Sequence, residues 1–168
     1  GGLEEGGSRI PFIVRWPRAI RGRQVSDLPI QTMDVTATVL AATGVEADPD
    51  YPLDGVNMLD WLVSGAPAPQ RDLKWRTHLQ GALRRGDRKL LVDRKAKPLW
   101  FTYFGKEGER VRLIDLADDG RERKDISTLE PELTAELLKE WREFDASLLP
   151  YDVPPAPIDA TPSGAKED

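Results

Sequence analysis

Apolar positions in the first half of the chain form one short continuous run and two segments of helical length. The run IPFIVRW, residues 10–16, is rich in β-forming residues and stops at Pro17, which predicts a strand covered on both faces of a sheet. Residues 32–44 predict a helix, with Thr32 or Asp34 as its cap and Gly44 at its end. A shorter helix is predicted over residues 57–65. A strand followed by helices indicates α/β architecture.

The second half of the chain has short apolar stretches separated by turn residues. Four strands are predicted, over residues 73–80, 81–86, 89–93 and 110–116, with Gly86-Asp87 as the clearest turn between them. Together they indicate a small antiparallel sheet. Residues 128–148 predict an amphipathic helix with Pro131 in its first turn. Its apolar stripe, which we expect to pack on the sheet, consists of Leu133, Leu137, Trp141, Phe144 and Leu148.

These patterns divide the chain of 168 residues into three parts. Residues 1–68 are expected to be the end of an α/β domain whose sheet needs further strands. Residues 69–149 are expected to form a small α+β subdomain. Residues 150–168 contain five prolines and almost no apolar periodicity, which predicts an extended or disordered tail.

Composition excludes several classes of protein. The net charge of −5 argues against a nucleic-acid partner, and the chain has no apolar run long enough to span a membrane. It also has no cysteine, which removes disulfides, thiolate zinc sites and cysteine nucleophiles. The single histidine, His78, rules out a histidine-based metal cluster and gives poor support to a serine–histidine triad.

Four places in the sequence are candidates for chemistry. The acidic glycine turn with Glu4, Glu5, Gly6, Gly7 and Arg9 suits either a bound anion or a tight loop that feeds the strand, with a surface Glu–Arg pair.

His78, expected in the first strand of the small sheet, suits either a substrate contact at a pocket rim or a half-exposed packing residue. Basic residues around Gly86-Asp87 form either an anion patch or a solvated hairpin end; they are Arg84, Arg85, Arg88 and Lys89. Asp118-Asp119 lacks the spacing of a calcium loop and is expected in a charged turn.

Taken in order, the motifs resemble the carboxyl-terminal part of the type I sulfatases, in the alkaline-phosphatase-like superfamily. The family segment Glu-Gly-Gly-x-Arg-x-Pro-Phe is matched at residues 5–12 and runs into Trp16-Pro17. A helix segment follows from Asp34 to Gly44, without the family's proline. The hairpin motif is matched at Ala82, Arg84, Gly86, Asp87, Lys89 and Leu90, and a later motif at Leu113, Asp115, Leu116, Glu122 and Asp125.

The resemblance implies a sulfuric ester hydrolase that acts on a small-molecule or glycan sulfate ester. It implies a formylglycine nucleophile and a calcium ion, both held by an amino-terminal catalytic region outside this chain, so the chain alone is expected to be inactive. Family members are often periplasmic, secreted or lysosomal. His78 and Arg9 are the substrate-pocket candidates. The residues expected to serve structure within the family motifs are Glu5, Gly6, Gly7, Asp34, Gly86, Asp87 and Lys89.

Two other functions remain open from the sequence. One is a phosphodiesterase or phosphonate hydrolase of the same superfamily. The other is a non-catalytic interaction module.

Overall fold

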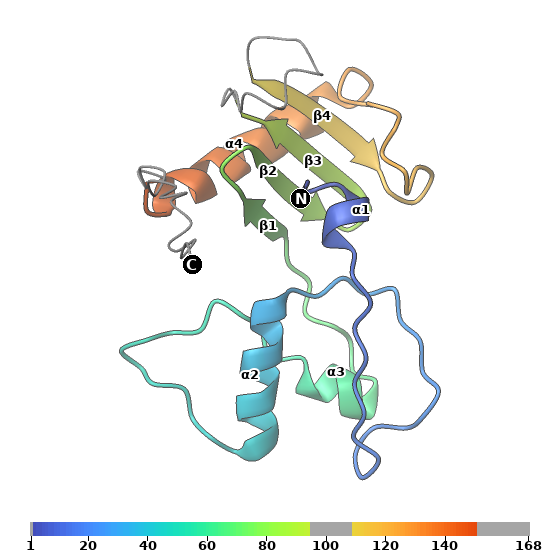
Figure 1. Ribbon diagram of the computed structural model, residues 1–168, viewed down its shortest axis with the longest axis vertical. Coiled ribbons are helices and arrows are strands. Elements are labelled where there is room, and N and C mark those ends of the chain that lie inside the picture. Colours follow the sequence, from blue (N-terminus) through green and yellow to red (C-terminus); the bar gives the residue numbers. More distant parts are fainter. Residues whose placement is uncertain (1, 95–108, 151–168) are drawn as a thin grey trace, which may run out of the picture.

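The computed structural model describes residues 2–94 and 109–150. A four-stranded sheet with a long helix forms one end of the molecule, and two shorter helices with extended connections form the other (Figure 1). Among these residues, no helix has the length and apolarity needed to cross a bilayer.

The small antiparallel sheet is confirmed, with strands in the order β1-β2-β3-β4. They span Leu73–Arg76, Gln80–Arg85, Arg88–Asp93 and Arg110–Asp115, and each is antiparallel to its neighbour. The predicted turn joins β2 to β3, and Gly86 adopts φ +56° there, a left-handed conformation that glycine reaches without a Cβ clash.

His78 does not lie within a strand, because the predicted strand over residues 73–80 is broken after Arg76. The Thr77 N–H donates to the Gln80 C=O over 2.7 Å, and the Gln80 N–H donates to the Thr77 hydroxyl over 2.9 Å. These bonds close a turn between β1 and β2. His78 lies in this turn and is exposed.

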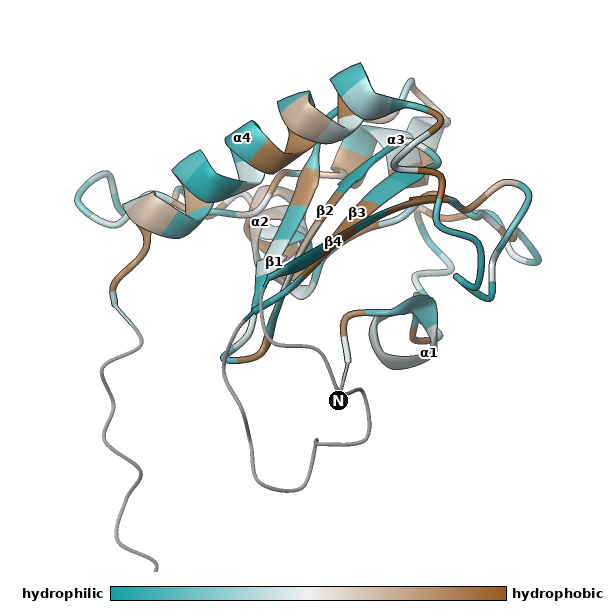
Figure 2. Cartoon of the chain, turned by 90° about the horizontal axis from the view of Figure 1, so that it is seen from above, coloured by the Kyte–Doolittle hydropathy of each residue, from teal (hydrophilic) through white to brown (hydrophobic). Residues whose placement is uncertain are grey.

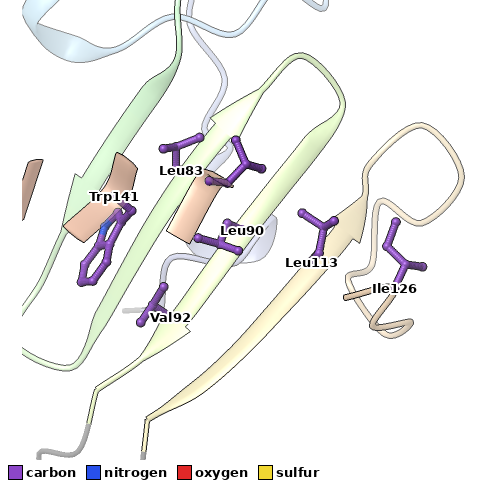
Figure 3. Packing of buried hydrophobic residues seen from close by; sticks show 7 residues of the cluster. Leu83, Leu90, Val92, Leu113, Ile126 and Trp141 are labelled. Atoms are coloured by element: carbon purple, nitrogen blue, oxygen red, sulfur yellow. The ribbon is translucent and has the colours of Figure 1, made fainter. Parts of the chain in front are cut away.

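The predicted amphipathic helix is α4, Pro131–Ser147, and it covers one face of the sheet (Figure 2). The α4 residues Leu137 and Trp141 are buried against the sheet, and they belong to the apolar cluster that Figure 3 shows. The sheet contributes Leu83, Leu90, Val92 and Leu113 to that cluster. A Cβ built at Gly81 would overlap the indole of Trp141, only 2.6 Å from its Nε1, so the absence of a side chain at this position lets the ring lie against β2.

The other face of the sheet is covered by the amino terminus of the chain. Leu3 packs on Ala82, Leu91 and Ile114, and the single helical turn α1, Glu5–Ser8, follows it. Figure 2 shows α1 and α4 on opposite sides of the sheet. Residues 2–8 therefore pack with β1 to β4. The domain boundary expected near residue 69 stays a prediction.

The helices α2, Thr32–Thr43, and α3, Leu59–Ser64, occur where the sequence predicted them, and both end at a glycine in the left-handed region, Gly44 and Gly65. The predicted caps of α2, Thr32 or Asp34, lie one and three residues after the observed one. Gln31 is the cap, and Asp34 completes a capping box from the third helical position.

The predicted strand at residues 10–16 is not formed. The segment is extended, and among the described residues it has no partner strand. Ile10 and Ile13 are 72% and 89% exposed. A strand needs a neighbour to satisfy its backbone N–H and C=O groups, and the described residues provide none here. The predicted tail beyond residue 150 lies outside the described residues.

Candidate functional site

The acidic glycine turn is attached to the sheet by a buried ion cluster at Lys89. The Lys89 Nζ lies 2.7 Å from Glu5 Oε1 and 3.0 Å from Glu122 Oε1. The side chains of Lys89 and Glu122 are 1% and 2% exposed. Arg84 adds a second cation, 3.7 Å from the Glu5 carboxylate. The cluster thus holds two carboxylates and two cations, which balances the buried charge.

Glu122 reaches this cluster from an uncommon backbone conformation. Its φ is +54°, in the left-handed region, which costs a non-glycine residue roughly 1–2 kcal/mol. One carboxylate oxygen lies beside Lys89, and the other accepts a hydrogen bond from the Glu5 N–H. Contacts with both partners therefore hold a conformation that the isolated chain would rarely adopt.

Neighbouring contacts attach the start of the turn to the opposite end of β2. The Leu3 N–H donates to Gln80 Oε1 over 2.8 Å, and the Gln80 amide donates to the Glu4 carboxylate over 3.2 Å. Arg112 also donates to Glu4, over 3.1 Å. Burial acts to raise the pKa of Glu4, but hydrogen bonds from its own backbone, Arg112 and Gln80 together lower this pKa.

Asp34 is the centre of a second buried set of polar contacts, at the amino-terminal end of α2. Its carboxylate accepts hydrogen bonds from the N–H groups of Gln31, at 2.7 Å, and Val56, at 2.9 Å, and it pairs with Arg71. A Cβ built at Gly55 would lie 2.8 Å from the Asp34 backbone N, so the chain passes close to α2 at this point. Asp34 therefore ties α2 to the turn before α3 and to the segment that enters β1.

The two pocket candidates, Arg9 and His78, lie at opposite ends of the sheet. Arg9 follows α1, which contacts Lys89 near the Gly86 turn, and it pairs with Asp27 over 3.0 Å in an exposed contact. His78 lies in the turn at the other end of β2. The structure does not bring the two side chains together. The glycine turn does not form the expected surface pair between a glutamate and Arg9. Glu4 binds Arg112 instead, and Glu5 binds Lys89.

The arginines at the predicted hairpin end are engaged by carboxylates. Arg85 lies 2.6 Å from each of Asp72, Glu136 and Glu140, and hydrogen bonds with Asp72 and Glu136 raise the pKa of its guanidinium. Arg88 binds Asp115 at 2.6 Å and Glu130 at 2.7 Å. These contacts support a network that joins the sheet to α4 and its preceding loop, rather than an open anion patch.

Within residues 2–94 and 109–150, no group of three or more histidine or carboxylate side chains could hold a metal ion. The described residues therefore do not fit the calcium ion that the resemblance implies. With no cysteine in the chain, the formylglycine residue has no cysteine precursor here.

Comparison with known proteins agrees with the motif order. An uncharacterised sulfatase of Schizosaccharomyces pombe is 28% identical over 158 residues, covering 87% of this chain and 26% of its own length. The chain is a relative of the sulfatases. Human steryl-sulfatase is 40% identical over 58 residues, which covers 34% of this sulfatase-related chain and 10% of the enzyme. The chain thus spans about a quarter or less of these two curated relatives.

A solved structure from a study of glycosaminoglycan metabolism in Bacteroides thetaiotaomicron has the same fold, with a TM-score of 0.66 and 22% identity. The match covers 84% of the sulfatase-related chain and 30% of the solved chain. No family model matches the chain. The predicted α/β fold, with a small antiparallel sheet packed by a carboxyl-terminal helix, is confirmed.

Sequence reasoning placed Glu5 and Lys89 in separate motifs and did not foresee that they meet. It also gave no role to Glu122, Arg112 or Gln80. The contacts join residues that are 76 to 117 positions apart, so no local pattern reveals them. The ordered family motifs were the one available signal, because Glu5, Lys89 and Glu122 each belong to a different one.

Proposed function

We propose that this chain is the carboxyl-terminal part of an enzyme that hydrolyses sulfate esters. The observation that carries the proposal is the convergence of three separate sulfatase-like motifs on one buried cluster, Glu5, Lys89 and Glu122, in a chain whose relatives are sulfatases. A chance resemblance of short motifs would not require their residues to satisfy one another's charges.

The chemistry requires a nucleophile and a divalent cation that stabilises charge on the sulfuryl oxygens. In the proposed enzyme, a formylglycine residue and calcium held by a preceding region supply these, and this chain alone does not turn over substrate. The contribution of this chain is to complete the catalytic α/β domain and to form one wall of the pocket. Arg9 and His78 are the proposed wall residues.

The extended segment at residues 10–16 supports a docking role for the first part of the chain. Three large apolar side chains, Ile10, Phe12 and Ile13, are more than half exposed there. A segment of this composition is stable when strands cover it on both sides. We propose that strands of the catalytic region pair with it.

The experiment compares two proteins, this chain alone and a chain extended upstream to include the preceding coding sequence. Both are assayed with 4-nitrophenyl sulfate and with a phosphonate ester. Hydrolysis of the sulfate ester by the extended protein alone supports the proposal. Preference for the phosphonate ester would favour the phosphonate hydrolase alternative, and a stop codon directly upstream of Gly1 would refute the fragment interpretation.

Two variants and one control test the pocket residues in the extended protein. His78→Ala and Arg9→Ala are expected to raise KM, while Arg123→Ala, an exposed arginine on the β4–α4 connection, is expected to leave KM unchanged. If KM in all three variants equals that of the wild-type extended protein, His78 and Arg9 do not contact the substrate.

A further inference from the structure

Lys89 is the only buried lysine among the residues that the structure describes, and three oxygen atoms lie near its ammonium group. Glu5 Oε1, at 2.7 Å, and Ser8 Oγ, at 3.4 Å, accept hydrogen bonds from it, and Glu122 Oε1, at 3.0 Å, forms an ion pair with it. Two of them belong to the glycine turn and one to the connection between β4 and α4. The ammonium group therefore joins three segments of the chain.

The turn that Lys89 holds has little stability of its own. Helix α1 is four residues long, and within it and its caps only the N–H groups of Gly7, Ser8 and Arg9 donate to carbonyls of Glu4 and Glu5. An isolated helical turn of this length does not persist in water, since nucleation costs more than so few bonds return. Its position must therefore come from contacts with the sheet.

The contact with Lys89 leads directly to Arg9. Lys89 binds the side chain of Glu5, and the backbone C=O of the same Glu5 accepts a hydrogen bond from the Arg9 N–H over 2.9 Å. The orientation of Glu5 thus determines where the chain leaves the turn, and Arg9 is the first residue after it. A shift of the Glu5 side chain would move Arg9.

We propose that Lys89 is a positioning residue, which sets the place of Arg9 through Glu5. The role of Arg9 in contacting the sulfate ester rests on the proposed function above. The attachment of the turn by Lys89 does not, so the two parts are tested separately.

The first test uses this chain and measures amide hydrogen exchange. In Lys89→Met, the amides of Glu5, Gly7, Ser8 and Arg9 are expected to exchange about 10- to 100-fold faster, the range that corresponds to losing one hydrogen bond to a charged group. Amides of the β2–β3 pairing are expected to keep their protection. Lys74→Met is the matched control, because Lys74 binds Glu140 of α4 over 2.8 Å and has no contact with the turn.

Glu5→Ala guards against a Lys89 variant that fails to fold. It leaves Lys89 paired with Glu122, so the sheet keeps a compensated lysine, while the turn loses its ion pair with the ammonium and keeps only the longer contact from Ser8 Oγ, at 3.4 Å. The same acceleration at residues 7–9 supports the proposal. Unchanged exchange there in Glu5→Ala, or equal acceleration in Lys74→Met, overturns it.

The second test uses the extended protein and 4-nitrophenyl sulfate. Glu5→Ala and Arg9→Ala are each expected to raise KM about tenfold, as for one lost hydrogen bond to a charged group, with kcat nearly unchanged. The double variant is expected to be no worse than Arg9→Ala, since both changes act on one contact. Additive effects, or an unchanged KM in Glu5→Ala, overturn the positioning role. An extended wild-type protein that fails to hydrolyse the ester refutes the proposed function instead, and the exchange experiment still decides the attachment.

Discussion

Replacement of Asp34 by alanine tests how much the buried contacts of this carboxylate, at the amino-terminal end of α2, stabilise the chain. The Asp34 side chain is 1% exposed and serves three partners: the N–H groups of Gln31 and Val56 and the guanidinium of Arg71. Alanine keeps the helical backbone but removes every acceptor. The three partners belong to the cap of α2, the turn before α3 and the segment before β1, so their loss should loosen all of these.

The magnitude follows from what happens to each partner. Loss of the capping interaction costs about 1 kcal/mol. The Val56 N–H is left without an acceptor in a partly buried place, which costs about 1–3 kcal/mol. The Arg71 side chain is 22% exposed and can turn toward water, so its share is below about 1 kcal/mol. We expect Asp34→Ala to lower the free energy of unfolding by about 3 kcal/mol, which these values support.

Urea denaturation followed by far-UV circular dichroism measures this loss. Asp34→Asn keeps one carbonyl oxygen as an acceptor and should lose about half as much. Thr36→Ala changes an exposed position on the same helix and should stay within about 0.5 kcal/mol of the wild-type chain. If Asp34→Ala were as stable as Thr36→Ala, the contacts of the Asp34 carboxylate would not contribute to stability.

Three further changes have defined outcomes. Gly81→Ala should lower the free energy of unfolding by about 1–3 kcal/mol, because the new methyl group overlaps Trp141 in a packed core. Gly22→Ala, which has open space around it, is the control in the same denaturation assay. For Asp125, burial raises the pKa, but hydrogen bonds from Ser127 and Leu113 outweigh it and lower the pKa overall. Its stabilising effect should therefore be complete above about pH 4, the ordinary pKa of aspartate, and disappear as the pH falls through the lowered value. Melting temperatures of the wild-type chain and Asp125→Asn should accordingly differ near neutral pH and converge in acid, and parallel curves would contradict this. The exposed apolar segment at residues 10–16 is expected to cause self-association of this chain. Ile13→Lys should therefore reduce self-association in sedimentation velocity without lowering the melting temperature, since Ile13 is 89% exposed. Unchanged association would show that this segment is not its cause.

The elements that the sequence predicted correctly are those whose signals are local. The stripe from Leu133 to Phe144 repeats with the helical period, and Pro131 suits the first turn, so α4 could be read from a single stretch. The β2–β3 hairpin is equally local, because Gly86 supplies the backbone conformation that its turn requires.

The sequence-based expectations and the structure differ where a distant partner or a side chain decides the outcome. Residues 10–16 have the composition of a buried strand, but a strand forms only beside another strand. The break at Thr77 depends on a hydroxyl that closes the turn, which outweighs the β-forming residues on either side of it. The cap of α2 is Gln31, one residue before the nearer predicted cap, because the Gln31 N–H donates a hydrogen bond to the Asp34 carboxylate.

The buried cluster at Lys89 also limits how this sequence can change over time. Glu5 is 84 positions from Lys89, and Glu122 is 117 positions from Glu5. A lineage that replaces the lysine by an apolar residue leaves two facing carboxylates in the interior, so substitutions at all three sites should be inherited together. In an alignment of relatives, the three columns should covary. A relative that keeps both acids but lacks the lysine should carry an arginine or another cation within reach of them.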